Sequence, residues 1–129
     1  MTIQLQKPYR ILVIGETCTD LYRFGRCDRL SAEAPVPVML QTRTESRPGM
    51  AANVALNIIS LGHTAVQVTS DTQIIKERFL DERFSQQILR VDSNDRCGSV
   101  DPSDVDNILK HNKQFDATII SDYDKGFLP

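Results

Sequence analysis

The chain has 129 residues, enough for one domain with its own hydrophobic core. Its 15 basic and 17 acidic residues nearly balance, and a net charge of −2 excludes the basic excess expected of a nucleic-acid-binding or membrane-binding surface. The apolar runs are too short to cross a bilayer and the first residues lack the apolar core of a secretory signal, so we predict a cytoplasmic protein.

The cysteines Cys18, Cys27 and Cys97 predict reduced thiols rather than a metal or disulfide site. Their number is odd, no pair has CxxC spacing, and no histidine is close to any of them in the sequence. These features argue against a zinc site and against a disulfide framework.

The first predicted element is a buried, parallel strand over residues 10–15, RILVIG, because an apolar run ends there at a glycine. GETCTD, residues 15–20, follows as a loop. A strand is predicted over residues 21–25, and CDRLSAEAP, residues 27–35, forms a second, polar loop.

A half-exposed antiparallel strand is predicted over residues 36–45, because apolar side chains alternate there before the sequence turns polar. The alternating positions are Val36, Val38 and Leu40. The nearby prolines fit an edge strand or the entry to a strand, since proline cannot donate to a central ladder.

A nearly all-apolar helix is predicted from about Met50 to Leu61, within PGMAANVALNIISLG, and Gly62 ends it. Such a helix should be buried. It carries Asn53 and Asn57 one turn apart. Either both amides are paired in an ordinary core, or the N-terminal end of the helix points at a polar ligand.

The second half of the chain predicts a core strand over 64–70 and a hairpin of strands 73–81 and 84–92, joined by a charged turn, DER. Too few residues separate the first two of these strands for a parallel crossover, which needs about a dozen. The two strands therefore should not lie side by side in one parallel sheet, or a segment is missing.

A helix is predicted to start at Asp101, with that side chain as the N-cap and Pro102 at the first helical position. Val105, Ile108 and Leu109 give this helix its apolar stripe. A last apolar strand covers DATIISD, residues 116–122, before a loop-like end.

Four segments together resemble the N-terminal part of the PfkB (ribokinase-like) sugar kinases: RLSAEAPVPV, RPGMAANVALN, QQILRVD and SDYDKG. The sequence is similar in particular to the D-glycero-beta-D-manno-heptose-7-phosphate kinase domain of the enzymes that make ADP-heptose, a lipopolysaccharide precursor. The similarity covers nearly the whole chain.

The resemblance implies an α/β fold with a truncated, ribokinase-like, mostly parallel sheet, flanking helices and a small antiparallel β lid over the sugar site. Residues 1–129 would form a single sugar-kinase-like domain with lid elements at about 20–47 and 73–92, and the C-terminal ATP-binding half would be absent. Lid strands in such kinases often also form a dimer contact. We therefore expect a homodimer, or pairing with a full-length kinase, through the lid.

The resemblance places three sugar-binding residues near the first predicted helix. Asp20 matches the family's N-terminal aspartate, whose carboxylate can accept two hydroxyl hydrogen bonds. Gly49 matches the first glycine of a Gly-Gly pair that lets the backbone approach the sugar. Asn53 matches an asparagine that bonds the sugar, whereas Asn57 is assigned to structure. The alternatives are a loop-ending aspartate and a core asparagine.

Four further substrate-binding candidates come from the lid hairpin and the end of the chain. Lys76 and Arg78 match basic residues that could meet a sugar phosphate, although an exposed charged strand face is an equal interpretation. Asp122 and Lys125 belong, with Tyr123, to an SDYxKG segment that borders the family's active-site cleft.

The chain departs from the family in three ways. Met50 stands where the second glycine is expected, and its side chain would narrow or reshape the site. A turn, a helix and a strand are missing between Thr69 and Thr72. The glycine-rich segment that binds ATP and supplies the catalytic base is not found, since the six glycines are isolated and no P-loop or GxGxxG occurs.

Two functions remain open on these grounds. As an enzyme, the chain would be the sugar-binding part of an ATP-dependent sugar-phosphate kinase, with no catalytic residue, metal or cofactor site of its own, although the intact family uses ATP and Mg²⁺. As a non-catalytic module, it would bind a sugar phosphate or regulate a kinase by pairing through its lid. A third possibility is a folded remnant without chemistry.

Overall fold

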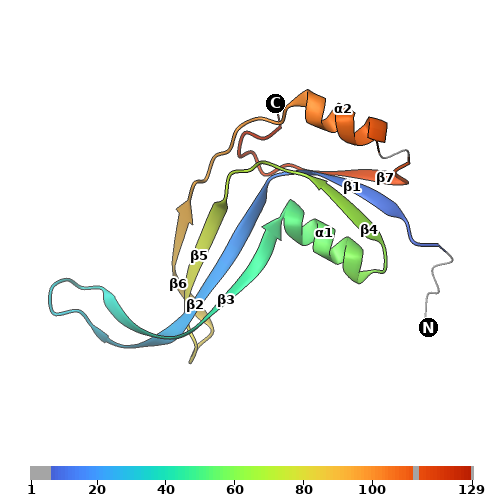
Figure 1. Cartoon of the computed structure of the whole chain (residues 1–129). Helices are drawn as coiled ribbons and strands as arrows, with labels where there is room; N and C mark the ends of the chain where they lie inside the picture. Colours follow the sequence, from blue (N-terminus) through green and yellow to red (C-terminus); the bar gives the residue numbers. More distant parts are fainter. Residues whose placement is uncertain (1–6, 112–113, 129) are drawn as a thin grey trace.

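The computed structural model describes residues 7–111 and 114–128 and has two sheets and two helices (Figure 1). In chain order the elements are β1 (Arg10–Gly15), β2 (Thr17–Leu30), β3 (Pro37–Met50), α1 (Ala51–Ser60), β4 (Thr64–Val68), β5 (Ile74–Asp81), β6 (Gln86–Ser93), α2 (Pro102–His111) and β7 (Ala117–Ser121).

The first sheet, called the core sheet below, has the strand order β4-β1-β7, and all its pairs are parallel. Helices α1 and α2 cover its opposite faces (Figure 1). Side chains alternate along β1, so Val13 packs against Ala51 and Ala55 of α1, whereas Leu12 packs against Val68 and Phe127 on the α2 side. This arrangement confirms the predicted parallel strand and the α/β class.

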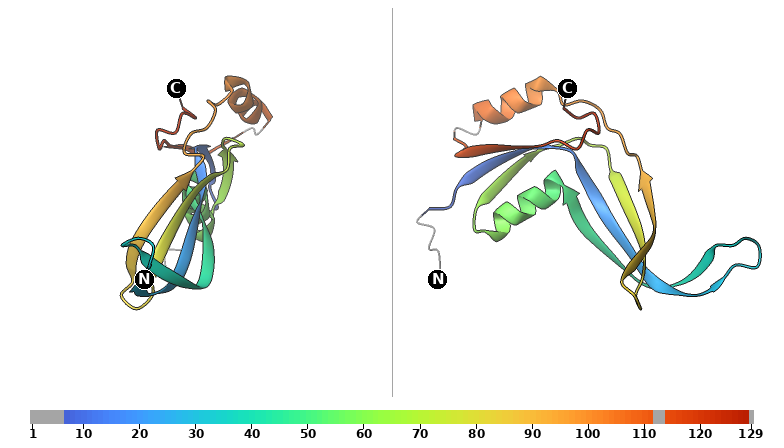
Figure 2. Two further views of the ribbon diagram at one scale, coloured as in Figure 1. Left: turned by 90° about the vertical axis from the view of Figure 1, so that its left-hand side faces the viewer. Right: turned by 180° about the vertical axis from the view of Figure 1, so that it is seen from behind.

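The second sheet, called the lid sheet below, has the order β3-β2-β5-β6. Two antiparallel pairs, β2/β3 and β5/β6, are joined by a parallel pairing of β2 with β5. The sheet curves away from the core sheet, and the connection between β2 and β3 extends furthest (Figures 1 and 2). Pro37 begins β3, an edge strand, as the sequence predicts.

The two sheets meet at a narrow junction. Glu16 alone separates β1 from β2, and β3 passes directly into α1 at Met50. A small buried cluster of Cys18, Met50 and Ile74 fills this junction. The short segment after β4 crosses from the core sheet to the lid sheet, which confirms that β4 and β5 are not neighbours in one parallel sheet.

Two predicted loops are wrong in their bounds. Residues 15–20 were expected as a loop, but β2 begins at Thr17, because its threonines pair with the neighbouring strands and one residue suffices for the change of sheet. The second predicted loop, residues 27–35, is shorter, since β2 continues to Leu30. Two of the alternating apolar positions of the predicted half-exposed strand, Val36 and Leu40, are 50% and 63% exposed.

Helix α1 confirms the predicted element to within one residue at each end, and Gly62 follows it with a φ of 86°. The prediction that this helix is buried is wrong for its outer face. Leu56 and Ile59 are exposed there, as are Asn53 and Asn57. Only one face of the helix meets the core sheet, so neither asparagine is a core amide.

Helix α2 starts as predicted. The Oδ1 atom of Asp101 accepts a hydrogen bond of 2.8 Å from the backbone N–H of Ser103, which satisfies one free donor of the first turn. Val105 and Ile108 pack toward the core sheet, whereas Leu109 is 48% exposed. Within the described ranges, no helix is long and apolar enough to cross a membrane.

Candidate functional site

Asp20 and Gly49 face each other across the β2/β3 pair at the junction of the two sheets. Asp20 lies on β2, two residues beyond Cys18, which is the register partner of Gly49. A Cβ atom on Gly49 would come within 3.0 Å of the Asp20 Cγ atom and 2.5 Å of the Cys18 Sγ atom. Glycine is therefore required at this position, because any side chain would displace the Asp20 carboxylate.

Asn53 joins Asp20 in lining one hollow. This hollow has a volume of about 280 Å³ and is lined by Asp20, Tyr22, Arg47, Pro48, Asn53 and Leu56. The side chain of Asn53 has no hydrogen bond to any residue that the structure describes, and it is exposed at the first turn of α1. Its amide is therefore available to a ligand in the hollow.

Met50 does not narrow this hollow, in contrast to the expectation from the sequence. Its backbone adopts a φ of 55°, the kind of conformation for which glycine is usually selected. Its side chain is 5% exposed and turns into the junction cluster with Cys18 and Ile74. Met50 therefore keeps the backbone turn expected of a glycine, and its side chain packs in the junction cluster and does not line the hollow.

Arg78 and Lys76 lie on β5 beside Asp20. An Arg78 N–H group donates to the Asp20 Oδ1 atom, and both side chains are about one-fifth exposed. Lys76 is the register partner of Asp20 and is only 9% exposed. In the part of the chain that the structure describes, no carboxylate forms an ion pair with the Lys76 ammonium group, so this buried charge has capacity to bind an anion.

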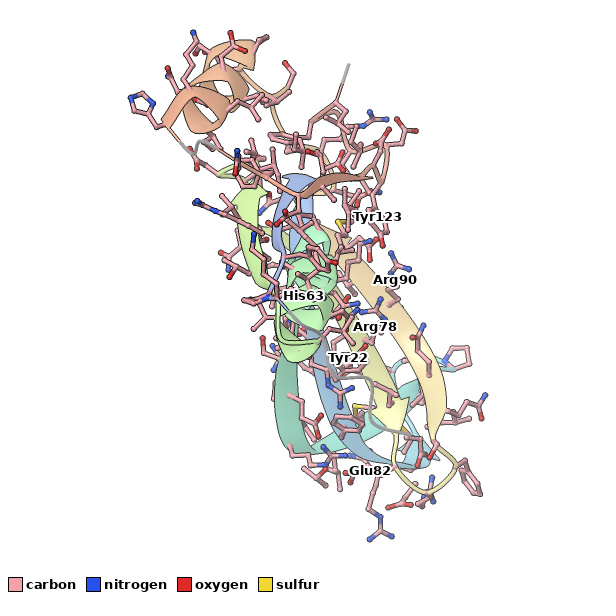
Figure 3. The ribbon with its side chains drawn as sticks, turned by 90° about the vertical axis from the view of Figure 1, so that its right-hand side faces the viewer. Tyr22, His63, Arg78, Glu82, Arg90 and Tyr123 are labelled. Carbon is pink, nitrogen blue, oxygen red and sulfur yellow. The ribbon has the colours of Figure 1, made fainter. Side chains whose placement is uncertain are left out.

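The loop that follows β7 approaches the same face of the lid sheet. The Tyr123 ring centroid lies 5.6 Å from the Lys76 Nζ atom. Lys125 forms an ion pair of 2.8 Å with Asp95, so its ammonium group is already engaged. Asp122 is exposed, and its Oδ1 atom accepts a hydrogen bond from the Asp124 backbone N–H. Figure 3 shows Tyr123, Arg90, Arg78 and Tyr22 along one band of the molecule.

The structure thus brings Asp20, Gly49, Asn53 and Arg78 together, with Lys76 adjacent. Lys125 instead forms its ion pair with Asp95, and Asp122 is exposed at the surface.

Several residues near the site were not singled out from the sequence. Arg47 and Tyr22 line the hollow, and the Arg47 guanidinium lies 5.1 Å from the Tyr22 ring centroid. Arg90 forms an ion pair of 2.6 Å with Asp92, which is the register partner of Lys76. Period-two alternation along the lid strands would have placed these side chains on the face of Asp20 once the pairing register was known.

Glu16 is the most deeply buried of the missed residues, with 0% exposure. Its Oε1 atom accepts hydrogen bonds from the backbone N–H groups of Lys125 and Phe127, and its Oε2 atom accepts one from Tyr123. Burial acts to raise the pKa of Glu16, but these backbone donors outweigh it and the pKa lies below its ordinary value. A charged residue directly after an apolar strand was the available signal.

The other face of the lid sheet carries an apolar hollow of about 430 Å³, lined by Cys27, Val36, Pro37, Met39, Phe79, Ile88 and Leu89. Phe79 and Leu89 are register partners, and Leu89 is 53% exposed. Apolar side chains grouped on an exposed sheet face are typical of surfaces that contact another protein.

Metal ions and nucleotide phosphates each need a particular set of donor groups. No cluster of three or more histidine, cysteine or acidic side chains suited to a metal occurs among the described residues. The isolated glycines do not form the backbone nest that cradles phosphates in nucleotide-binding loops.

Comparison with known proteins gives a consistent result. The chain is 35% identical over 148 residues to the Bifunctional protein HldE of Edwardsiella ictaluri, across 92% of this chain and 31% of that protein. It is also 35% identical over 147 residues to the Bifunctional protein HldE of Yersinia pseudotuberculosis, across 92% of this chain and 30% of that protein. The chain therefore spans about a third of the length of these relatives.

The fold is similar to that of a putative phosphofructokinase from Staphylococcus aureus. The TM-score is 0.55 at 10% sequence identity, and the match covers 93% of this chain and 45% of that chain. No family model matches the sequence. The alignment with the Edwardsiella ictaluri protein spans 148 positions, more than the 129 residues of this chain. That protein therefore has residues within the aligned span that have no counterpart here.

Proposed function

The chain belongs to the PfkB (ribokinase-like) carbohydrate kinase family and is heptose-kinase-like, and from this premise we propose that it binds a phosphorylated sugar of the heptose 7-phosphate class. The hollow beside α1 would take the sugar ring. Lys76 and Arg78, beside the hollow, would take its phosphate group. The observation that carries this proposal is that Asp20 and Asn53 line one hollow, with Gly49 packed closely against the Asp20 carboxylate.

The chemistry of the hollow supports a polyhydroxylated, anionic ligand. Asp20 offers acceptors for sugar hydroxyls, and Asn53 offers both a donor and an acceptor. The buried Lys76 ammonium has no carboxylate partner among the described residues, and a ligand phosphate would compensate its charge. Arg78 already holds Asp20, so it would orient that carboxylate as well as attract the anion.

We propose further that these 129 residues do not transfer phosphate by themselves. Phosphoryl transfer depends on positioning ATP and Mg²⁺ and on stabilising charge with a glycine-rich backbone segment, which this sequence lacks. In the proposal, those parts come from another region or another chain. Measurable ATP turnover by the purified 129-residue chain would contradict this part. The predicted cytoplasmic location remains part of the same proposal.

Titration calorimetry with heptose 7-phosphate tests the binding proposal. We expect Asp20→Ala and Asn53→Ala each to weaken binding about tenfold or more, because each removes a hydrogen bond to the ligand. Asn57→Ala is the matched control, since Asn57 is exposed on the same helix but does not line the hollow. No binding by the wild-type chain at millimolar ligand would refute the proposal, as would equal losses in all three variants.

A second function, pairing through the lid, is supported by the apolar hollow around Phe79 and Leu89. We propose that this face contacts a second copy of the chain, or the lid of a full-length kinase. Light scattering should then show a dimer that Leu89→Ser weakens. Ile120→Ser, at an exposed position on the core sheet, is the control. A monomer at high concentration in the wild type would exclude self-association.

A further inference from the structure

Glu16 is a buried residue whose main chain and side chain connect three segments of the chain. It lies between β1 and β2, where the core sheet passes into the lid sheet. Its carboxylate accepts hydrogen bonds of 3.0 Å from Tyr123, 3.0 Å from Lys125 and 3.4 Å from Phe127. The donors are all backbone N–H groups, so the carboxylate fixes the path of the loop after β7 irrespective of that loop's side chains.

The main chain of Glu16 fixes a second segment. Its carbonyl oxygen accepts a hydrogen bond of 2.9 Å from the backbone N–H of Ala51, the first residue of α1. That N–H is one of the helix donors that no other helical residue can satisfy. The bond sets where α1 begins, and therefore where Gly49 and Asn53 stand relative to Asp20.

The loop held by Glu16 reaches the proposed phosphate-binding residues. It carries Tyr123, whose ring lies over the Lys76 ammonium, and Lys125, which pairs with Asp95 after β6. On its opposite side the loop also accepts bonds from the segment after β6: the N–H and Sγ groups of Cys97 donate to the Lys125 carbonyl, and the Val100 N–H donates to the Phe127 carbonyl. Glu16 therefore holds the main chain of this loop at three positions, alongside the side-chain ion pair of Lys125 with Asp95.

We propose that Glu16 is a positioning residue for the ligand site, holding the start of α1 and the loop of residues 122–127 in the geometry that a sugar phosphate needs. This inference rests on the proposed function. Glu16 does not touch the ligand, because its carboxylate is fully buried and all its bonds go to the protein main chain. It acts through Tyr123, Lys76 and Asn53.

The substitution Glu16→Gln isolates this role. A glutamine has one acceptor oxygen, and its NH₂ group cannot accept a bond, so at least one of the three loop N–H groups loses its partner in a buried place. We expect binding of heptose 7-phosphate to weaken about tenfold. Glu82→Gln is the matched control: it removes a charge bonded to Thr42 and Arg43 at the far end of the lid sheet.

Amide hydrogen exchange gives the readout that a general loss of stability would not produce. In Glu16→Gln without ligand, exchange should accelerate at Tyr123, Lys125 and Phe127, while the amides of β1 and β4 keep wild-type protection. Uniform acceleration across the core sheet would show that Glu16 only stabilises the fold, and would overturn the inference. If Glu16→Gln does not fold, Glu16→Asp keeps the charge but shortens the reach, and the same pattern is expected.

The two proposals fail in distinguishable ways. If the wild-type chain binds no heptose 7-phosphate, the proposed function fails and the inference fails with it. If the wild type binds and folded Glu16→Gln binds equally well, the proposed function stands and the positioning role of Glu16 is refuted. Weakened binding together with accelerated exchange confined to the three loop amides would support both.

Discussion

The core sheet and the lid sheet are stabilised by different interactions, although β1 and β2 are separated by a single residue. In the core sheet, two apolar clusters lie on opposite faces, and Leu12 and Val13 of β1 are 1% and 0% exposed. In the lid sheet, strands β2 and β3 are each 14 residues long, yet few of their side chains are buried. Burial of apolar surface therefore stabilises the first sheet far more than the second.

The lid sheet relies on cross-strand polar contacts instead. Ion pairs connect its strands at several levels: Arg23 with Glu77, Arg78 with Asp20, Arg43 with Glu82 and Arg83 with Asp28. The Arg43 guanidinium also lies 3.5 Å from the Phe24 ring centroid. Such pairs contribute little each when exposed.

This difference suits a binding surface. Apolar burial packs α1 against the core sheet, and the buried Glu16 carboxylate holds the loop after β7, whereas the lid presents charged side chains that would meet a ligand in the proposed site. The proposed site lies where the two kinds of structure meet, at Glu16, Gly49 and Met50.

The largest expected effect tests the contrast directly. Leu12→Ala removes a fully buried side chain from the α2 side of the core sheet, so we expect the free energy of unfolding to fall by about 3 kcal/mol. Leu89→Ala, the same change at a position on β6 that is 53% exposed, should cost less than about 0.5 kcal/mol in the monomer. Urea denaturation measures both. Equal losses would show that the lid has an apolar core of its own.

A smaller effect is expected at the junction. Gly49→Ala places a methyl group against the Asp20 carboxylate and the Cys18 sulfur, and the neighbouring atoms can give way only in part. We expect a loss of about 2 kcal/mol in stability together with loss of sugar-phosphate binding. Gly98→Ala is the matched control, because nothing lies within 4 Å of the Cβ atom it would add. Retained binding in Gly49→Ala would mean that the ligand does not need Asp20 in its present position.

Titration of Asp81 tests whether the polar contacts of the lid sheet form in solution. Hydrogen bonds from the Arg83 side chain, partly opposed by burial, lower the pKa of Asp81 from its ordinary value of 3.8 to about 2. Because the pKa of Asp81 is lower in the folded than in the unfolded chain, its ionised carboxylate stabilises the fold at pH values above the unfolded pKa. This contribution is lost as the pH falls from about 4 towards 2.

The substitution Arg83→Gln should return the pKa of Asp81 towards 3.8, as followed by carboxyl ¹³C shifts. Asp101 is the internal control, since its pKa is lowered by its bonds to Ser103 and should not respond. An unchanged Asp81 titration would show that the ion pair does not form in solution.

Most of the fold was predictable from local pattern. Apolar runs predicted β1, β4 and β7, Asp101 and Pro102 predicted the start of α2, and the charged turn predicted the β5/β6 hairpin. The short connection after β4 left two interpretations open, and the structure agrees with the one in which β4 and β5 are not neighbours in one parallel sheet. These features depend on neighbours in the sequence, so the sequence alone carries them.

Features that depend on distant partners were not predictable. The extension of β2 back to Thr17 follows from pairing with β3 and β5, which no local pattern reveals. The exposure of Asn53 and Asn57 follows from the single face on which α1 meets the core sheet. Glu16 was missed because its partners are main-chain donors more than 100 residues away, a contact that leaves no motif.

The smallest expected effect concerns Glu45, which pairs with Arg43 and Arg47 along one exposed edge strand. These side chains are 36% to 63% exposed, so water screens the attraction and the ordering of long side chains offsets it. We expect Glu45→Gln to change the free energy of unfolding by less than about 0.5 kcal/mol, and less still in 1 M salt. Paired urea denaturations at low and high salt measure this change. A loss comparable with that of Leu12→Ala would mean that exposed ion pairs stabilise the lid as strongly as apolar burial stabilises the core sheet, and the contrast between the two sheets would not hold.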